Sequence, residues 1–302
     1  MSRQHPVIAI TGSSGAGTST VKKAFEHIFH RNDIKPLIIE GDSFHMYDRA
    51  EMKANVIREE ENGNLFFSHF GPQANHFNKI ATTFADYGST GHCERRYYLH
   101  SDQEAEHHNA RLGTSLNPGE FTPWELVEEE TDLLFYEGLH GAIVTDDVNV
   151  AQHADLKIGV VPNVNLEWIQ KIHRDNAERG YHAHEIVDTI LRRMPDYVNY
   201  ITTQFSETDI NFQRVAIVDT SNPFIARDIP TPDESLIVIR FNDTEKFEPD
   251  YTYLLSMLKD SFMSRRNTLV VPGGKMGLAM EIILGPIIKK MLKKKSKSRQ
   301  TQ

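Results

Sequence analysis

A glycine-rich loop at residues 12–19, Gly-Ser-Ser-Gly-Ala-Gly-Thr-Ser, carries the clearest chemistry in the sequence. The apolar run Val7–Thr11 before it predicts a strand, and Ser19–Phe29 predicts a helix. In this context glycines let backbone N–H groups surround the β-phosphate of ATP, and the helix N-terminus adds partial positive charge. The Ser19 hydroxyl is placed to hold Mg²⁺. The predicted nucleotide-binding residues are Gly12, Ser13, Ser14, Gly15, Ala16, Gly17, Thr18, Ser19 and Thr20.

One position of this loop departs from the usual form. Thr18 stands where a phosphate-binding lysine is expected. Two interpretations remain open. The loop is damaged and non-catalytic, or a basic residue from elsewhere in the chain supplies the missing charge on the transferring phosphoryl group.

Two carboxylates follow short apolar runs. Asp42 comes two residues after the run Pro36–Glu40, and Glu137 ends the run Asp132–Glu137. A carboxylate at the end of a strand near the phosphate loop can accept the proton of an attacking hydroxyl, and we expect this role for Asp42. We expect Glu137 to contact Mg²⁺ directly or through water. The alternative is that Asp42 caps a turn and Glu137 caps a strand end.

A cluster of charges lies on the helix expected from Leu166 to Arg179. The spacing of Lys171, Arg174, Asp175 and Arg179 places all four along one face. This face is either a solvated surface with weak ion pairs or a cationic stripe that binds polyphosphate. On the next expected helix, Arg192 and Arg193 are candidates for a lid that closes over the stripe.

The elements that must position these residues alternate between strand and helix. Further strands are expected at Asp155–Val161, Arg214–Val218, Ser235–Phe241 and Thr268–Val271, and further helices at His184–Met194 and Lys275–Leu292. This alternation predicts an α/β fold of the P-loop NTPase type, with a mainly parallel sheet covered by helices on both faces. Residues 43–130, with one weak helix at Asn75–Tyr87, read as a polar insertion at the carboxyl ends of the strands, where such folds bind ligands.

We expect a single domain over residues 1–290 and a basic tail over residues 291–302. The tail is interpreted as a solvated, frayed terminus rather than a membrane or nucleic-acid patch. The net charge of −9 argues against general nucleic-acid binding, and no apolar run approaches the roughly 20 residues of a membrane span. A single cysteine, Cys93, forms no internal disulfide, so a cytoplasmic enzyme is expected.

Histidine is abundant in the chain, with 15 residues, and several of them crowd the insertion. They raise the question of a zinc site. No pair among His69, His76, His92, His100, His107 and His108 has the spacing of a helical or finger-type site, so we expect no structural metal there.

Seven segments, several of them long, resemble those of bacterial phosphoribulokinases. They are TGSSGAGTST, IEGDSFHMYDR, LLFYEGLHGAIV, ADLKIGVVPNVNLEWIQKIHRD, ILRRM, QFSETDINFQRV and DTSNPFIARDIPTPDES. The resemblance runs from about residue 5 to residue 285 and implies MgATP-dependent phosphorylation of D-ribulose 5-phosphate at its 1-hydroxyl. Threonine at position 18 is also typical of this family, so the absent lysine becomes a family trait.

The resemblance also implies roles for individual residues. Asp42 would be the base, Glu137 would lie near Mg²⁺, Lys171 would be the cation on the transferring phosphate, and Asp175 would be a further catalytic carboxylate. Arg193 would bind ATP as part of a mobile lid. The sugar phosphate would be bound by His45, Arg49, His100, Arg174 and Arg179.

Regulation and assembly are implied in the same way. Members of this family are homo-oligomers that are activated by NADH and inhibited by AMP, and Arg31, Arg240 and Arg265 match basic positions of the effector pocket. Residues 75–117 diverge most, so two alternatives stay open. One is another P-loop kinase of a small alcohol, such as a uridine- or pantothenate-type kinase, and the other is a nucleotide-binding regulator without turnover.

Overall fold

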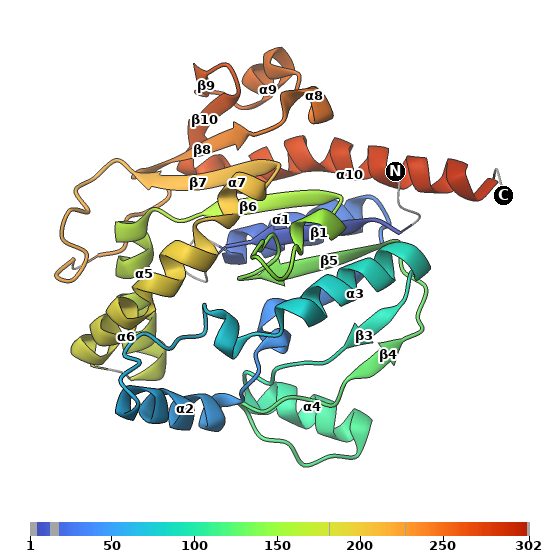
Figure 1. Ribbon diagram of the computed structural model, residues 1–302. Coiled ribbons are helices and arrows are strands. Elements are labelled where there is room, and N and C mark those ends of the chain that lie inside the picture. The colour runs from blue at the N-terminus through green and yellow to red at the C-terminus, as the bar shows by residue number, and fades with distance from the viewer. Residues whose placement is uncertain (1–4, 13–17, 181, 227, 301–302) are drawn as a thin grey trace.

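A mixed eight-stranded sheet runs through the computed structural model (Figure 1). The structure describes residues 5–12, 18–180, 182–226 and 228–300, with only the backbone at residues 18, 19, 178, 179 and 294–300. The strand order is β2-β5-β1-β6-β7-β8-β10-β9. The strand bounds are β1 Val7–Thr11, β2 Pro36–Glu40, β5 Leu133–Gly138, β6 Leu156–Val161, β7 Ile210–Ala216, β8 Ser235–Phe241, β9 Phe262–Arg265 and β10 Thr268–Pro272.

The first five strands in this order are parallel, and the last three add antiparallel pairings at one edge. The expected mainly parallel sheet is therefore confirmed for the half that carries the phosphate loop. Strand β7 begins four positions earlier than expected, at Ile210, because the buried Ile210 and Phe212 alternate with polar Asn211 and Gln213. The exposed edge strand β9 was not anticipated from the sequence.

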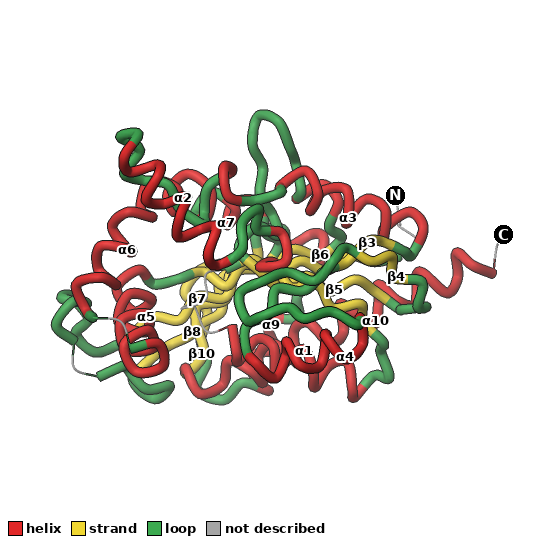
Figure 2. Tube along the Cα trace, turned by 90° about the horizontal axis from the view of Figure 1, so that it is seen from below, coloured by secondary structure: helices red, strands yellow, loops and turns green. Residues whose placement is uncertain are grey.

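Helices cover both faces of the sheet, as Figure 2 shows. On one face, α1 (Thr18–Arg31) packs beside α10 (Met276–Gln300) over a core built from alternate residues of the strands. On the other face, α3 (Phe77–Thr90) buries Phe77, Ile80, Phe84 and Tyr87 against the opposite side chains of β1, β2 and β5. Because both faces are covered, β1 is buried along its whole length and β5 is buried from Leu133 to Tyr136, and both runs are mainly apolar.

The segment 43–130 contains more regular structure than its composition indicates. It forms α2 (Arg49–Glu61), α3, α4 (Asp102–Leu112) and a two-stranded ribbon of β3 (Cys93–Arg95) and β4 (Glu125–Val127). In Figure 1 this segment, coloured light blue to green, lies together below the sheet. Helices α2 and α4 were missed because each buries few side chains. Their first turns still carried a signal, since Asp48 and Ser101 cap them and each is followed three residues later by a glutamate.

A pair of helices follows β6. Helix α5 (Val164–Arg179) starts at the cap of Asn163, slightly before the expected start, and α6 (Ala183–Asp196) packs against it. A π-helical turn at Tyr197–Ile201 and the short α7 (Gln204–Glu207) then lead into β7. The short helices α8 (Thr244–Phe247) and α9 (Tyr251–Met257) connect β8 to β9.

Helix α10 continues to Gln300, beyond the expected end at Leu292, so most of the basic tail belongs to this helix. Within the part of the chain that the structure describes, no helix combines the length and the apolar character needed to cross a bilayer.

Candidate active site

The phosphate loop lies between the carboxyl end of β1 and the start of α1. The backbone N–H of Gly12 donates to the carbonyl of Gly138, with a donor–acceptor distance of 3.2 Å. A Cβ at position 12 would lie 2.7 Å from the carbonyl oxygen of Val160, so this position requires glycine. The loop residues Ser13, Ser14, Gly15, Ala16 and Gly17 lie outside the described residues, as do the side chains of Thr18 and Ser19. Their roles, and that of exposed Thr20, stay predictions.

Asp42 and Glu137 lie at the ends of neighbouring strands. Strands β2 and β5 are paired in parallel, with Glu40 opposite Glu137, and Asp42 follows in a short 3-10 helix, Gly41–Phe44. The two strand ends approach closely, because a Cβ added to Gly41 would lie 2.7 Å from the Cα of Gly138. The sheet therefore brings both carboxylates to the edge where the phosphate loop begins.

The carboxylate of Asp42 is surrounded by imidazole rings. Its Oδ1 lies 3.3 Å from His45 Nε2, its Oδ2 lies 3.8 Å from His100 Nε2, and its side chain is 44% exposed. Loss of hydration alone would raise the pKa of Asp42. When the rings carry a proton, the hydrogen bond from His45 and the charges of the nearby histidines outweigh this effect and hold the pKa of Asp42 well below its usual range. Asp42 is therefore ionised and accessible, rather than occupied in capping its own turn.

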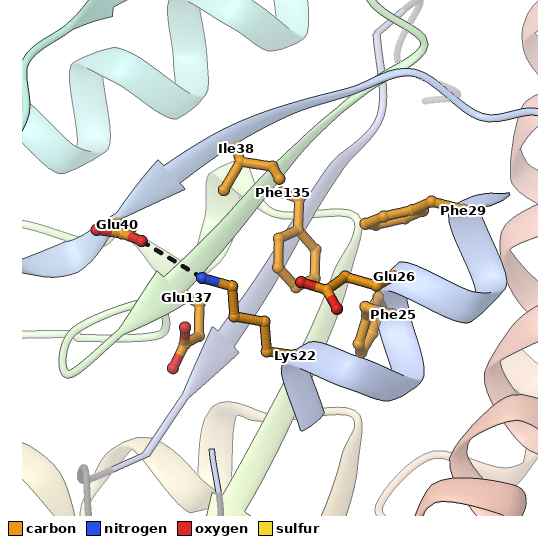
Figure 3. Close-up of a pocket in the computed structure, with 8 residues that line it drawn as sticks. All are labelled: Lys22, Phe25, Glu26, Phe29, Ile38, Glu40, Phe135 and Glu137. Atoms are coloured by element: carbon orange, nitrogen blue, oxygen red, sulfur yellow. Dashed lines mark ion pairs between the residues drawn. The ribbon is translucent and has the colours of Figure 1, made fainter. Parts of the chain in front are cut away.

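Glu137 faces a second cluster of charge, drawn in Figure 3. Glu40, Glu137 and Lys22 lie together there, and Lys22 Nζ is 3.9 Å from Glu40 Oε1. Burial raises the pKa of Glu137 to about 7, with further contributions from the negative charges of Glu40 and Asp42, while Lys22 lowers it. Neither Lys22 nor Glu40 was expected at this site from the sequence.

These carboxylates fit the hard oxygen chemistry of Mg²⁺. Such an ion would offset the repulsion from Glu40 and Asp42, which adds to the effect of burial on the pKa of Glu137, and it needs only one or two protein carboxylates beside substrate phosphates. The described residues contain no group of three histidine, cysteine, aspartate or glutamate side chains that could hold a metal ion by themselves. Burial raises the pKa of the Cys93 thiol to about 12, which does not favour a thiolate ligand.

The charged face of α5 is shielded from water, unlike a solvated surface. Asp175 is only 3% exposed. Lys171 Nζ donates to Asp175 Oδ2, while Arg174 Nε and Nη2 donate to Oδ1 at 3.1 and 3.0 Å. Loss of hydration and the charge of Arg193 lower the pKa of Lys171 to about 8, although the contact with Asp175 raises it. The expected grouping of these three residues is confirmed, and the Arg179 side chain lies outside the described part.

The two arginines expected in a lid differ in their surroundings. The Arg193 guanidinium lies 5.3 Å from the centre of the Phe70 ring, and its charge acts on both Lys171 and His69. Arg192 Nη1 instead lies 3.0 Å from Glu60 Oε1 on α2. Arg193 therefore belongs to the site, whereas Arg192 ties α6 to the inserted segment.

Arg49 stands at the first position of α2 and is exposed. Its backbone N–H donates to the carbonyl of Gly119 at 2.9 Å. Gly119 has φ +100°, and a Cβ added to it would lie 2.8 Å from the Arg49 Cβ, so glycine permits this contact. The guanidinium has no ion pair among the described residues and remains available to a substrate phosphate.

Three further residues around Asp42 were not predicted from the sequence to belong to this site. The Arg96 guanidinium donates to the carbonyls of Ser43 and His45, both at 2.6 Å. The ring of His69 stacks on that of His45 at a centroid distance of 5.2 Å, and Asn75 Oδ1 lies 2.8 Å from His45 Nδ1. These partners come from residues 69–96, where no spacing pointed to the site, so only the tertiary structure reveals them.

The three arginines expected in an effector pocket do not all lie on the same face of the eight-stranded sheet. Arg240 and Arg265 are both paired with Thr268, so they point to the same side of the sheet. Their neighbours Ile239 and Phe241 point to the other side, into the core beneath α1, where Arg31 is the last helical residue.

Comparison with known proteins shows the family to which the chain belongs. A model of the phosphoribulokinase/uridine kinase family matches residues 7–221. The chain belongs to this family. Its α/β fold, the kinase class and the resemblance drawn from its motifs are thereby confirmed. As a member of this family of P-loop kinases, the chain uses ATP and Mg²⁺.

Several relatives match this chain over nearly its whole length. The chromosomal phosphoribulokinase of Cupriavidus necator is 57% identical over 300 residues, covering 99% of this chain and 100% of that protein. The phosphoribulokinase of Nitrobacter vulgaris is 56% identical over 298 residues, with 99% and 100% covered. A solved structure of phosphoribulokinase from Rhodobacter spheroides superposes with a TM-score of 0.86 at 52% identity, covering 97% of this chain and 99% of that one.

Proposed function

We propose that the chain transfers the γ-phosphoryl group of ATP to the 1-hydroxyl of D-ribulose 5-phosphate, giving D-ribulose 1,5-bisphosphate and ADP. The observation that carries this proposal is the identity of 57% over the full length of a protein named phosphoribulokinase. The divergent residues 75–117 lie inside that match, which covers 99% of the chain.

Asp42 acts as the base in this proposal. The O–H bond of the sugar hydroxyl breaks, its oxygen bonds to the γ-phosphorus, the bond from that phosphorus to the ADP oxygen breaks, and the proton passes to Asp42. Its accessible carboxylate supports the role, and its depressed pKa keeps the group ionised at neutral pH, with an oxygen free to accept the hydroxyl proton.

Lys171 supplies the charge that the phosphate loop lacks at Thr18. Its proximity to Arg193 supports a concentrated positive potential for the transferring phosphoryl group. Asp175 contributes through the two cations that it holds, Lys171 and Arg174. The carboxylate of Glu137 and the hydroxyl of Ser19 are the proposed contacts of Mg²⁺, which neutralises phosphate charge when bound.

The sugar phosphate is assigned to the basic groups around this edge of the sheet. Exposed Arg49 supports a phosphate contact, and His100 and Arg174 border the base and the lysine. His45 contacts Asp42, so it is placed to serve the hydroxyl end of the substrate as well. Arg179 completes the predicted set.

A coupled assay that follows ADP release tests the function directly. We expect turnover with MgATP and D-ribulose 5-phosphate, and none with uridine or pantothenate at the same concentration. Turnover of another alcohol would overturn the acceptor assignment. ATP binding without turnover on any acceptor would point to a nucleotide-binding regulator.

Regulation and assembly are further parts of the proposal. We propose a cytoplasmic homo-oligomer that NADH activates and AMP inhibits, with Arg31, Arg240 and Arg265 in the effector pocket. The separation of Arg31 from Arg240 on opposite faces of the sheet supports a pocket completed by a second copy of the chain. Light scattering and the response of Arg240→Ala to NADH test these points, and a monomer with an intact response would contradict them.

A further inference from the structure

A buried asparagine lies behind the proposed base. Asn75 is 2% exposed and lies between α3 and the turn that carries Asp42. Its side-chain nitrogen Nδ2 is 2.7 Å from the carbonyl oxygen of His69 and 2.8 Å from that of Gly71. Only an NH₂ group can donate to two carbonyls, so the orientation of this amide is fixed by its surroundings, and Oδ1 must be the acceptor on the opposite side.

The orientation of the amide fixes the hydrogen on His45. Asn75 Oδ1 is 2.8 Å from His45 Nδ1, and an amide oxygen can only accept, so Nδ1 must carry the hydrogen. The other ring nitrogen, Nε2, then presents its lone pair toward Asp42 Oδ1 at 3.3 Å when the ring is neutral. The hydrogen bond from His45 to Asp42 therefore forms only when the ring carries hydrogens on both nitrogens, whereas the neutral ring offers Asp42 an acceptor.

The backbone keeps the two partners in register. His45 and Asn75 face each other in an antiparallel bridge. The N–H of Met46 donates to the carbonyl of Ala74, and the N–H of His76 donates to the carbonyl of Phe44, both at 2.9 Å. Because the ring of His69 also stacks on His45, the imidazole is held at one ring face as well as at Nδ1.

We propose that Asn75 is a positioning residue for phosphoryl transfer, because it holds His45 in the tautomer with hydrogen at Nδ1 and so keeps an acceptor, Nε2, against Asp42. This inference rests on the proposed role of Asp42 as base. When the carboxylate of Asp42 takes the proton of the sugar hydroxyl, the lone pair at His45 Nε2 accepts a hydrogen bond from the new carboxyl group. The opposite tautomer would offer no such acceptor.

A double-mutant cycle separates this role from simple loop packing. We expect Asn75→Ala to lower kcat about tenfold or more in the wild-type background, since orienting a general base is part of its contribution. In a His45→Ala background, the same change should alter kcat by less than about twofold, because Asn75 acts through His45. Equal losses in the two backgrounds would overturn the proposal.

Asn109 offers a matched control in the same inserted segment. Its Nδ2 donates to the carbonyl of Leu116, and its Oδ1 accepts from the backbone N–H of Leu116 and from the Thr114 hydroxyl, all at 2.8 Å. Asn109→Ala therefore removes a comparable loop-fixing amide away from Asp42. We expect its kcat to stay unchanged. A tenfold loss there would show that loop order, and not the His45 tautomer, is being measured.

The wild-type protein supplies a test that needs no folded Asn75 variant. In protein labelled with ¹⁵N-histidine, the His45 resonances are assigned by their absence in His45→Ala. At a pH where the ring is neutral, we expect hydrogen on Nδ1. Hydrogen on Nε2 would overturn the inference.

Failure of the base assignment would look different. An unchanged kcat in Asp42→Asn would remove Asp42 as the base, and the inference about catalysis would fall with it, whatever the tautomer. A large loss in Asp42→Asn together with additive effects of Asn75→Ala and His45→Ala would remove only the role of Asn75.

Discussion

Lys171 and Asp175 form an ion pair one helical turn apart on α5, and the aspartate is almost completely buried. The same carboxylate also binds Arg174, so a single negative charge holds two cations at the edge of the site. Because the cluster is buried, the protonation state of each side chain depends on the charges of the other two.

The pH dependence of turnover should report on Lys171. Its pKa is lowered to about 8, so the ammonium form is present below that pH and is lost as the pH rises through it. If Lys171 supplies the charge on the transferring phosphate, kcat/KM for ATP should fall on the basic side of a pH profile, with a midpoint near this value. In Lys171→Arg that basic limb should disappear, because a guanidinium stays charged. A flat profile in the wild type would contradict the assignment.

Removing the charge of Asp175 should affect both stability and this pH profile. Asp175→Asn leaves two cations facing each other in a buried setting, which we expect to cost about 3–5 kcal/mol in denaturant unfolding. Because Asp175 raises the pKa of Lys171, its loss should also move the basic limb of kcat/KM to lower pH.

A surface pair provides the comparison for that measurement. Lys35 Nζ lies 2.7 Å from Glu129 Oε1, and both side chains are more than half exposed. Glu129→Gln should leave the denaturation midpoint unchanged, since solvent screens exposed pairs. Equal effects of Asp175→Asn and Glu129→Gln would mean that the buried cluster is not a stabilising unit.

Asp42→Asn should lower kcat by about 10²–10⁴-fold, because the amide cannot accept the hydroxyl proton. The KM for ATP should change little, since the change leaves the phosphate loop intact. Steady-state kinetics with both substrates varied would show this separation. A normal kcat would remove Asp42 from the base role.

The close approach of β2 and β5 should tolerate no side chain at Gly138. A Cβ there would lie 2.6 Å from the Cα of Gly41, so Gly138→Ala must push the two strand ends apart, together with Asp42 and Glu137. We expect lower stability and lower kcat.

Gly277 in the first turn of α10 gives the matched control, because a Cβ at that position has no atom within 4 Å. Gly277→Ala should stabilise the protein by a few tenths to about 1 kcal/mol through helix propensity, with kcat unchanged. A thermal unfolding series would compare the two variants. Similar midpoints would contradict the packing argument at Gly138.

The sequence predicted the parallel core and its chemistry well, because both have local signals. The runs Val7–Thr11 and Pro36–Glu40 are bounded by turn residues, and the strands have these same bounds. Helix α2 has no comparable apolar stripe, since it buries only Met52 and Asn55, so periodicity could not reveal it. Its capping residue Asp48 with Glu51 was the available signal.

The sequence by itself determined which side chains are candidates for the chemistry. They follow the ends of strands or lie on one charged helix. A glycine loop without lysine, with Thr18 in its place, called for a cation from elsewhere, and Lys171 on its charged helix was available. These inferences rest on spacing within single elements, which a sequence displays directly.

The tertiary structure alone decided which groups surround Asp42. His45, His69 and Asn75 meet only because the chain between the turn after β2 and α3 folds back on itself, and the pairing of His45 with Asn75 closes a loop of 30 residues. The energy that selects one such closure comes from packing and hydrogen bonds between distant segments, so no local pattern encodes it.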